Sequence, residues 1–104
     1  MNGMPSNKHQ RELPTARKIR RACSNELYRT AKRLKGYISK EQMEQAEKLY
    51  TRKVYLNLVF VHENRDNRKK LCDWWDDNVA AEIAELWQAE PEKLKTAFRD
   101  AFGG

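Results

Sequence analysis

A run of basic side chains between residues 15 and 36 is the part of this sequence best suited to chemistry with an anion. The run reads TARKIRRACSNELYRTAKRLKG and holds eight Lys or Arg residues but a single acid, Glu26. Exposed helices usually mix the two signs, because opposite charges four residues apart stabilise a helix and like charges destabilise it. Arg17 and Arg21 are four residues apart with no acid to compensate. A polyanion would relieve this repulsion, because successive Lys and Arg residues neutralise phosphates and release counterions.

The basic residues of this run share one side of a predicted helix. At about 100° per residue, they lie opposite an apolar side that contains Ile19, Cys23 and Leu27. Tyr28 falls among them and is able to hydrogen-bond a phosphate or stack on an unpaired base. The predicted nucleic-acid-binding residues are Arg17, Lys18, Arg21, Tyr28, Arg29, Lys32 and Lys35.

Other interpretations of the basic segment stay open. An ordinary solvated helix surface and a docking surface for an acidic protein would show the same charges. A helix-turn-helix would put the following helix into the DNA major groove, where Glu41, Glu44 and Glu47 would face phosphates. A membrane-surface helix needs large apolar side chains, whereas this one offers small ones such as Cys23 and Ala31. Nucleic acid is therefore the preferred partner.

The stretch DWWDD, residues 73–77, holds a second group of chemically interesting side chains. Asp73 and Asp77 lie one helical turn apart, and two carboxylates on one face are able to hold Mg²⁺ together with water. No third ligand follows nearby, and Lys69 stands four residues before Asp73, where it is able to form an ion pair. We therefore expect these acids to be structural and predict no metal site.

The remaining nucleophilic and titratable side chains show no catalytic pattern. Cys23 and Cys72 lack the spacing of a zinc site and fall on apolar helix faces, so we expect two buried free thiols. His9 and His62 have no Ser, Cys or Asp at a spacing typical of a nucleophile or a ligand set. The sequence also lacks a Gly-rich phosphate loop and an HExxH motif. We therefore expect no enzyme and no cofactor.

The length and charge of the chain limit the number of domains and indicate the kind of partner. The chain has 104 residues, enough for one domain, and a net charge of +6. The charge is unevenly distributed, because residues 1–40 carry eleven basic and two acidic side chains, whereas residues 41–104 carry ten and thirteen. Such asymmetry indicates an acidic partner. The N-terminus lacks an apolar leader and no run approaches the roughly 18 apolar residues of a membrane span, so we expect a cytoplasmic location.

Capping signals divide the chain into a tail and a helical domain. Residues 1–13 have little apolar content and predict a flexible N-terminal tail, and residues 14–104 predict a single helical domain. Thr15 is the expected N-cap and Gly36 the expected C-cap of the first helix, and Ser39 with Gln42 forms a capping-box pattern. Pro91 suits the first turn of the last helix. The prediction is an all-α bundle of about four helices, at 15–36, 39–62, 67–89 and 91–102.

Residues 54–62, VYLNLVFVH, are ambiguous between helix and strand. Their β-branched and aromatic content favours a strand, but no other segment is typical of a strand that could pair with them. We therefore favour a helix whose extra apolar surface is buried centrally or in a homodimer. Trp74 lies beside the apolar side of its predicted helix and is a second expected anchor of this homo-oligomer.

Together these patterns predict a small, basic, non-catalytic nucleic-acid-binding protein, an accessory or regulatory factor. It would contact phosphates through the basic side of its first helix. The alternative is a protein-interaction module, an adaptor or inhibitor that docks on an acidic protein partner. The choice between DNA and RNA, and any sequence preference, stay open.

Overall fold

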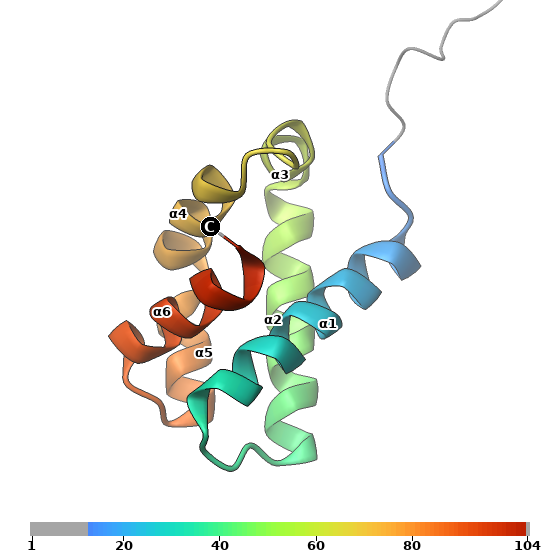
Figure 1. Cartoon of the computed structure of the whole chain (residues 1–104). Coiled ribbons are helices and arrows are strands. Elements are labelled where there is room, and N and C mark those ends of the chain that lie inside the picture. Colours follow the sequence, from blue (N-terminus) through green and yellow to red (C-terminus); the bar gives the residue numbers. More distant parts are fainter. Residues whose placement is uncertain (1–12, 104) are drawn as a thin grey trace, which may run out of the picture.

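Six helices make up the part of the chain that the computed structural model describes, residues 13–103. They are α1 (Ala16–Leu34), α2 (Lys40–Leu56), α3 (Leu58–Glu63), α4 (Arg68–Asn78), α5 (Ala80–Trp87) and α6 (Pro91–Phe102), and Figure 1 shows their arrangement. No strand occurs in this part of the chain, so the predicted all-α class is confirmed. The predicted tail lies outside the described residues except for Leu13.

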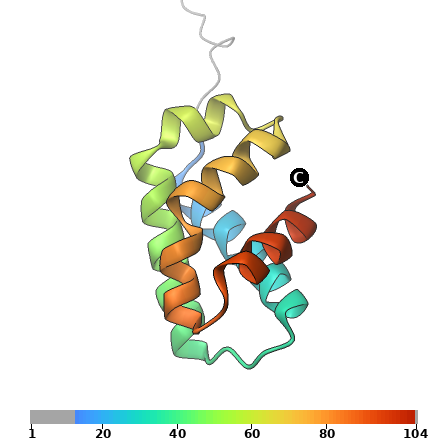
Figure 2. The ribbon, with the colours of Figure 1, turned by 90° about the vertical axis from the view of Figure 1, so that its left-hand side faces the viewer.

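The helices pack around one core. Helix α1 packs against both α2 and α6, and α5 packs against α2 and α6. Figure 2 shows α2 and α5 running alongside each other, with α3 turned across one end of the molecule. No helix within residues 13–103 is long and apolar enough to cross a lipid bilayer.

Three aromatic side chains from different helices form the centre of the core. The rings of Trp75 and Phe98 stack with centroids 3.9 Å apart, and Tyr50 meets both rings edge-on at 6.1 and 6.2 Å. Trp75 and Phe98 are almost fully buried, and Leu27 of α1 packs into the same cluster. Aromatic pairs in these geometries add about 0.5–1.5 kcal/mol each beyond the burial of their area. The stack therefore joins α2, α4 and α6 at one point.

The start of α1 agrees with the sequence prediction, and its end does not. Thr15 Oγ1 accepts a hydrogen bond from the backbone N–H of Lys18 at 3.2 Å, so the predicted N-cap is confirmed. The helix ends at Leu34, and Lys35 rather than Gly36 takes the left-handed conformation, with φ of 60°. A non-glycine residue pays about 1 kcal/mol for that conformation. Leu34, the last residue of α1, packs against the core next to this turn.

The ambiguous segment is helical but interrupted. The capping box of α2 is present, with Ser39 Oγ accepting from Gln42 N and Gln42 Oε1 accepting from Ser39 N. The predicted single helix over residues 39–62 is wrong, because Asn57 takes a non-helical conformation and separates α2 from α3. Figure 2 shows that α3 then turns away from the axis of α2.

Three asparagines explain where helices end. Asn57, Asn64 and Asn78 each donate a side-chain N–H to the carbonyl oxygen four residues earlier, at 2.8–2.9 Å. These bonds lie at the ends of α2, α3 and α4. An amide side chain that bonds to the nearby backbone competes with the helical ladder and so favours termination. The asparagines are therefore the sequence signal for the breaks.

The C-terminal half shows the same division. The predicted helix over residues 67–89 is interrupted at Val79, which follows Asn78 and separates α4 from α5. Asn67 caps α4 by accepting from Lys70 N at 3.0 Å. Helix α6 begins at Pro91 as predicted and ends where Gly103 takes φ of 88°. Residues 13–103 thus contain six shorter helices where about four were predicted.

The tryptophans and cysteines lie inside the bundle. Trp74 is only 8% exposed within the single chain, so its ring is not displayed at the surface as an interface anchor would be. Trp87 is also buried and donates its indole N–H to Gln42 O at 3.1 Å. Cys23 and Cys72 are buried free thiols, as predicted. Burial raises the pKa of the Cys23 thiol to about 12, which keeps it protonated and unreactive.

Candidate nucleic-acid interface

Helix α1 buries one side and exposes the other. Ile19, Cys23 and Leu27 enter the core, because they recur at spacings of four residues on one side of the helix. Five of the predicted contact residues lie on the opposite side and are exposed to solvent. We call this set the outer face; it consists of Arg17, Arg21, Tyr28, Lys32 and Lys35.

The charges of the outer face are not neutralised by acids in the described part of the chain. Within residues 13–103, the only salt bridge of α1 joins Arg33 to Asp100 at 3.6 Å. None of the four cations of the outer face forms a salt bridge with a carboxylate in that range. Their charge is therefore available to an external anion.

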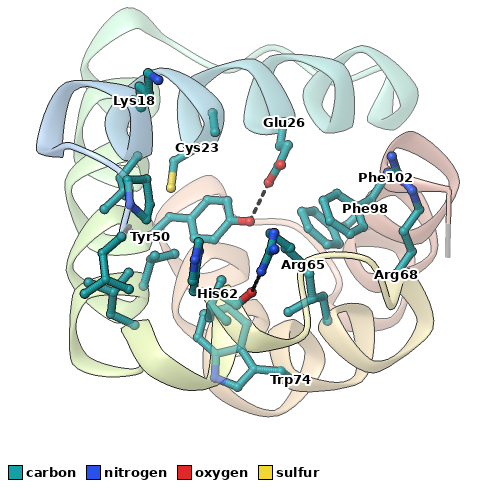
Figure 3. Close-up of a pocket in the computed structure, with 18 of the residues that line it drawn as sticks. Lys18, Cys23, Glu26, Tyr50, His62, Arg65, Arg68, Trp74, Phe98 and Phe102 are labelled. Carbon is teal, nitrogen blue, oxygen red and sulfur yellow. Dashed lines mark hydrogen bonds between the residues drawn. The ribbon is translucent and has the colours of Figure 1, made fainter. Parts of the chain in front are cut away.

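The single acid of α1 points inward. Glu26 accepts a hydrogen bond of 2.5 Å from the hydroxyl of Tyr50, a buried residue of α2 (Figure 3). Burial raises the pKa of the Glu26 carboxyl, while the Tyr50 hydrogen bond and the nearby Arg29 and Arg68 act in the opposite direction. Because Glu26 lies on the inner side of α1, its charge does not compensate the outer face.

Two of the seven predicted contact residues belong to a different region. Lys18 and Arg29 are exposed but line a cavity of about 720 Å³. The cavity opens between α1, α3, the first half of α4 and the C-terminal half of α6. Arg65 and Arg68 line the same cavity. The structure therefore divides the predicted set into the outer face and two residues beside this cavity.

A second basic surface adjoins α1 on the side of α2. Arg20 of α1 and Lys48 and Arg52 of α2 line a hollow of about 330 Å³, together with Thr51, Tyr55 and Leu56. We call this hollow the basic groove. No acid lines it, although Glu47 lies at the same helix boundary and accepts a hydrogen bond from Ser24 at 2.7 Å. Three cations beside an exposed Tyr suit a phosphate backbone with an adjacent base.

The groove residues of α2 were missed in the sequence. Lys48 and Arg52 stand four residues apart, which is the spacing that distinguished Arg17 and Arg21, although Glu44 precedes Lys48 by four residues and partly compensates it. The signal was therefore present, but it becomes a surface only when α2 packs against α1 and brings Arg20 alongside. The same helix exposes Glu41 and Glu44 nearer its start, as the sequence predicted, whereas Glu47 is half-buried and bonds to Ser24 of α1.

Asp73 and Asp76 of the acidic stretch of α4 form ion pairs, whereas Asp77 is exposed and forms none within residues 13–103. Arg99 of α6 bridges Asp73 and Asp76 at 2.9 and 2.7 Å, and Lys69 pairs with Asp73 at 3.4 Å. The Arg99 hydrogen bond is the main reason that the pKa of Asp73 is lowered. These contacts join α4 to α6 and give the acids a structural role. Among residues 13–103, no group of three or more His, Cys, Asp or Glu side chains is placed to hold a metal ion.

Comparison with protein-family models, curated protein sequences and solved structures gives no significant match to this chain. The chemistry of the surface is therefore argued from its own side chains. The outer face and the basic groove offer exposed guanidinium and ammonium donors together with Tyr28 and Tyr55. Such groups bind phosphate oxygens and stack on bases.

Proposed function

We propose that this protein is a small non-catalytic nucleic-acid-binding factor with an accessory or regulatory role. The outer face of α1 makes the principal phosphate contacts, and the basic groove extends them across α2. The observation that carries this proposal is the absence of any salt bridge to the four outer-face cations within residues 13–103.

The dimensions of the outer face fit a phosphate backbone. Arg17 and Lys35 lie at opposite ends of α1, roughly 27 Å apart along the helix axis at 1.5 Å per residue. That length spans roughly eight base-pair steps of a duplex, at 3.4 Å along the duplex axis for each. Contacts of this kind position the nucleic acid without reading its bases. Sequence preference should therefore be weak.

Tyr28 and Tyr55 offer a way to distinguish single from double strands. Both side chains are exposed, and each lies beside cations that would hold the backbone. Base stacking on an aromatic side chain is worth about 1–3 kcal/mol for each base, but only when the base is unpaired. If stacking contributes, Tyr28→Ala should weaken binding to a single strand more than binding to a duplex.

Copurification provides the first direct test of the proposed function. The purified protein should show an excess of absorbance at the nucleic-acid wavelength that disappears after a high-salt wash. Fluorescence anisotropy with labelled duplex and single-stranded oligonucleotides should then give saturable binding that weakens as salt rises. Saturable binding that is insensitive to salt would contradict a phosphate-directed interface.

A protein-interaction module is the second candidate, and one observation favours it. Tyr55, Leu56, Val59 and Phe60 form an exposed apolar patch where α2 bends into α3, with Leu56 71% exposed. Tyr55 and Leu56 also line the basic groove, so apolar and cationic groups adjoin on one surface. An acidic protein segment with apolar anchors would fit this combination. Such a complex would depend less on salt than phosphate binding does.

The same apolar patch is the proposed site of self-association. It comes from residues 54–62, whose excess apolar surface predicted a homodimer. Light scattering of the wild type should give twice the mass of the chain, and Leu56→Asp should return a monomer with unchanged helix content. Because Leu56 is largely exposed in the single chain, loss of folding in this variant would not be expected.

A further inference from the structure

The cavity beside α1 is built like a small-molecule site. Its volume of about 720 Å³ falls within the 300–1,000 Å³ typical of ligand pockets. Its walls are mainly apolar and come from separate helices: Ile19 from α1, Val54 from α2, Trp74 from α4, and Phe98 and Phe102 from α6. Figure 3 shows these aromatic side chains around the space that Tyr50 and Glu26 border.

Cations surround this apolar interior. Lys18 and Arg29 approach from α1, Arg65 follows α3, and Arg68 begins α4. None of the four forms a salt bridge in the described part of the chain. The single acid in the lining is Glu26. Four cations facing one carboxyl give the cavity a positive field.

Two lining residues carry buried nitrogen atoms without a hydrogen-bond partner. They are Nε1 of Trp74 and Nε2 of His62. The Trp74 side chain is more than nine-tenths buried, so its indole N–H has little access to bulk water. Buried donors in folded proteins normally have partners, so these two lining residues keep hydrogen-bonding capacity that the described residues do not satisfy.

From these features we infer that the cavity binds a small amphipathic anion, a molecule with an apolar body and one carboxylate or phosphate group. The body would lie between Trp74 and Phe98, which form the apolar wall. The anionic group would meet Arg65, whose guanidinium donates to His62 O and keeps further N–H donors. Lys18 and Arg68 add positive charge from opposite sides of the cavity (Figure 3). This inference does not depend on nucleic-acid binding.

Three probes with the same chain and different head groups test the charge requirement. Decanoate, decanol and decylammonium are titrated at concentrations below micelle formation, and binding is followed by ¹H–¹⁵N NMR of the indole N–H signals. The Trp74 signal should shift and saturate with decanoate, whereas the Trp87 signal should stay, because Trp87 bonds to Gln42 away from the cavity. Decanol should bind at least tenfold more weakly than decanoate, and decylammonium more weakly still.

Two double variants, one inside the cavity and one outside it, test where the anionic group binds. Lys18→Gln with Arg65→Gln should bring decanoate affinity towards that of decanol, since only Arg29 and Arg68 then remain as cations in the lining, while leaving decanol affinity unchanged. Arg68 is kept, because its guanidinium bonds to Phe102 O and packs on the Phe102 ring. The control, Lys48→Gln with Arg52→Gln, removes the same charge from the basic groove and should not affect either probe.

Three outcomes would overturn the inference. Equal affinity for all three probes, or equal shifts of the Trp74 and Trp87 signals, would show apolar partitioning without a built site. The absence of saturable binding by any probe would show that the cavity takes no amphiphile. If decanoate binds the Lys18 and Arg65 double variant as tightly as the wild type, these two residues do not contact the anion. Lys18→Gln alone repeats this test if the double variant is unstable.

Discussion

Reversing two charges on the outer face should change both the affinity for nucleic acid and its salt dependence. The variant combines Arg21→Glu with Lys32→Glu, two exposed residues of α1 that form no salt bridge within residues 13–103. Their removal breaks no described ion pair, so the fold should persist and circular dichroism should show unchanged helix content. The net charge falls from +6 to +2, since each reversal changes it by two.

The magnitude follows from the number of free cations. The outer face carries four, and each phosphate contact with a duplex adds about 0.9 to the log–log salt slope, giving a slope of at least about −3.6. Raising salt from about 50 to 200 mM should therefore weaken wild-type binding roughly 150-fold. With two cations left, the slope should be shallower by about 1.8, and the same change in salt should weaken binding only roughly tenfold. The difference in slope holds even if the basic groove adds contacts.

The assay is fluorescence anisotropy with a labelled duplex over a salt series. The matched control combines Lys70→Glu with Lys93→Glu, which gives the same net charge from exposed positions on α4 and α6, outside the outer face and the basic groove. The control should keep the wild-type slope. An unchanged slope in the outer-face variant, or an equal loss in the control, would refute the assignment of the contacts to α1.

Three further predictions concern the groove, the inward acid and a helix end. Lys48→Glu with Arg52→Glu should also lower affinity and reduce the salt slope in the same assay, and an unaffected slope would remove the basic groove from the interface. Because burial raises the pKa of Glu26 above its ordinary value of about 4.5, the folded protein holds this proton more tightly than the unfolded chain. The free energy of unfolding should therefore fall as pH rises through this range, and Glu26→Gln should remove that fall in urea titrations at several pH values; an identical pH profile would contradict it. Gln88→Gly should stabilise the protein by about 1 kcal/mol in urea unfolding, because Gln88 ends α5 in the left-handed conformation that glycine adopts without strain; destabilisation would contradict that account.

The local features of the fold were readable from the sequence because they depend on neighbouring residues. Thr15, the capping box at Ser39 and the position of Pro91 each involve contacts within one helical turn. The breaks at Asn57 and Val79 were harder to predict. Apolar periodicity continues across both positions and therefore gives no sign of a helix end. The signal is the side chain of Asn57 or Asn78, which hydrogen-bonds to a carbonyl oxygen of the preceding turn.

The sequence predicted which residues lie on the exposed side of α1, but it did not predict which residues of other helices complete the candidate site. The position of Arg21 and the inward position of Glu26 on α1 follow from the helical period, whereas the hydrogen-bond partner of Glu26, Tyr50, comes from α2. The basic groove likewise requires α1 and α2 to meet at Arg20. Trp74 was misplaced for the same reason, because its burial comes from helices that are distant in sequence.

The packing of α1 on α6 has a consequence for the order in which the molecule assembles. The first and last described helices lie against each other, so the contact closes a loop that contains nearly the whole domain. Contacts between segments so far apart in sequence form late, because the loop-closure entropy must be offset first. During synthesis, the helix with the densest positive charge would stay without its partner until α6 emerges. The folding of the basic surface is therefore coupled to the synthesis of α6.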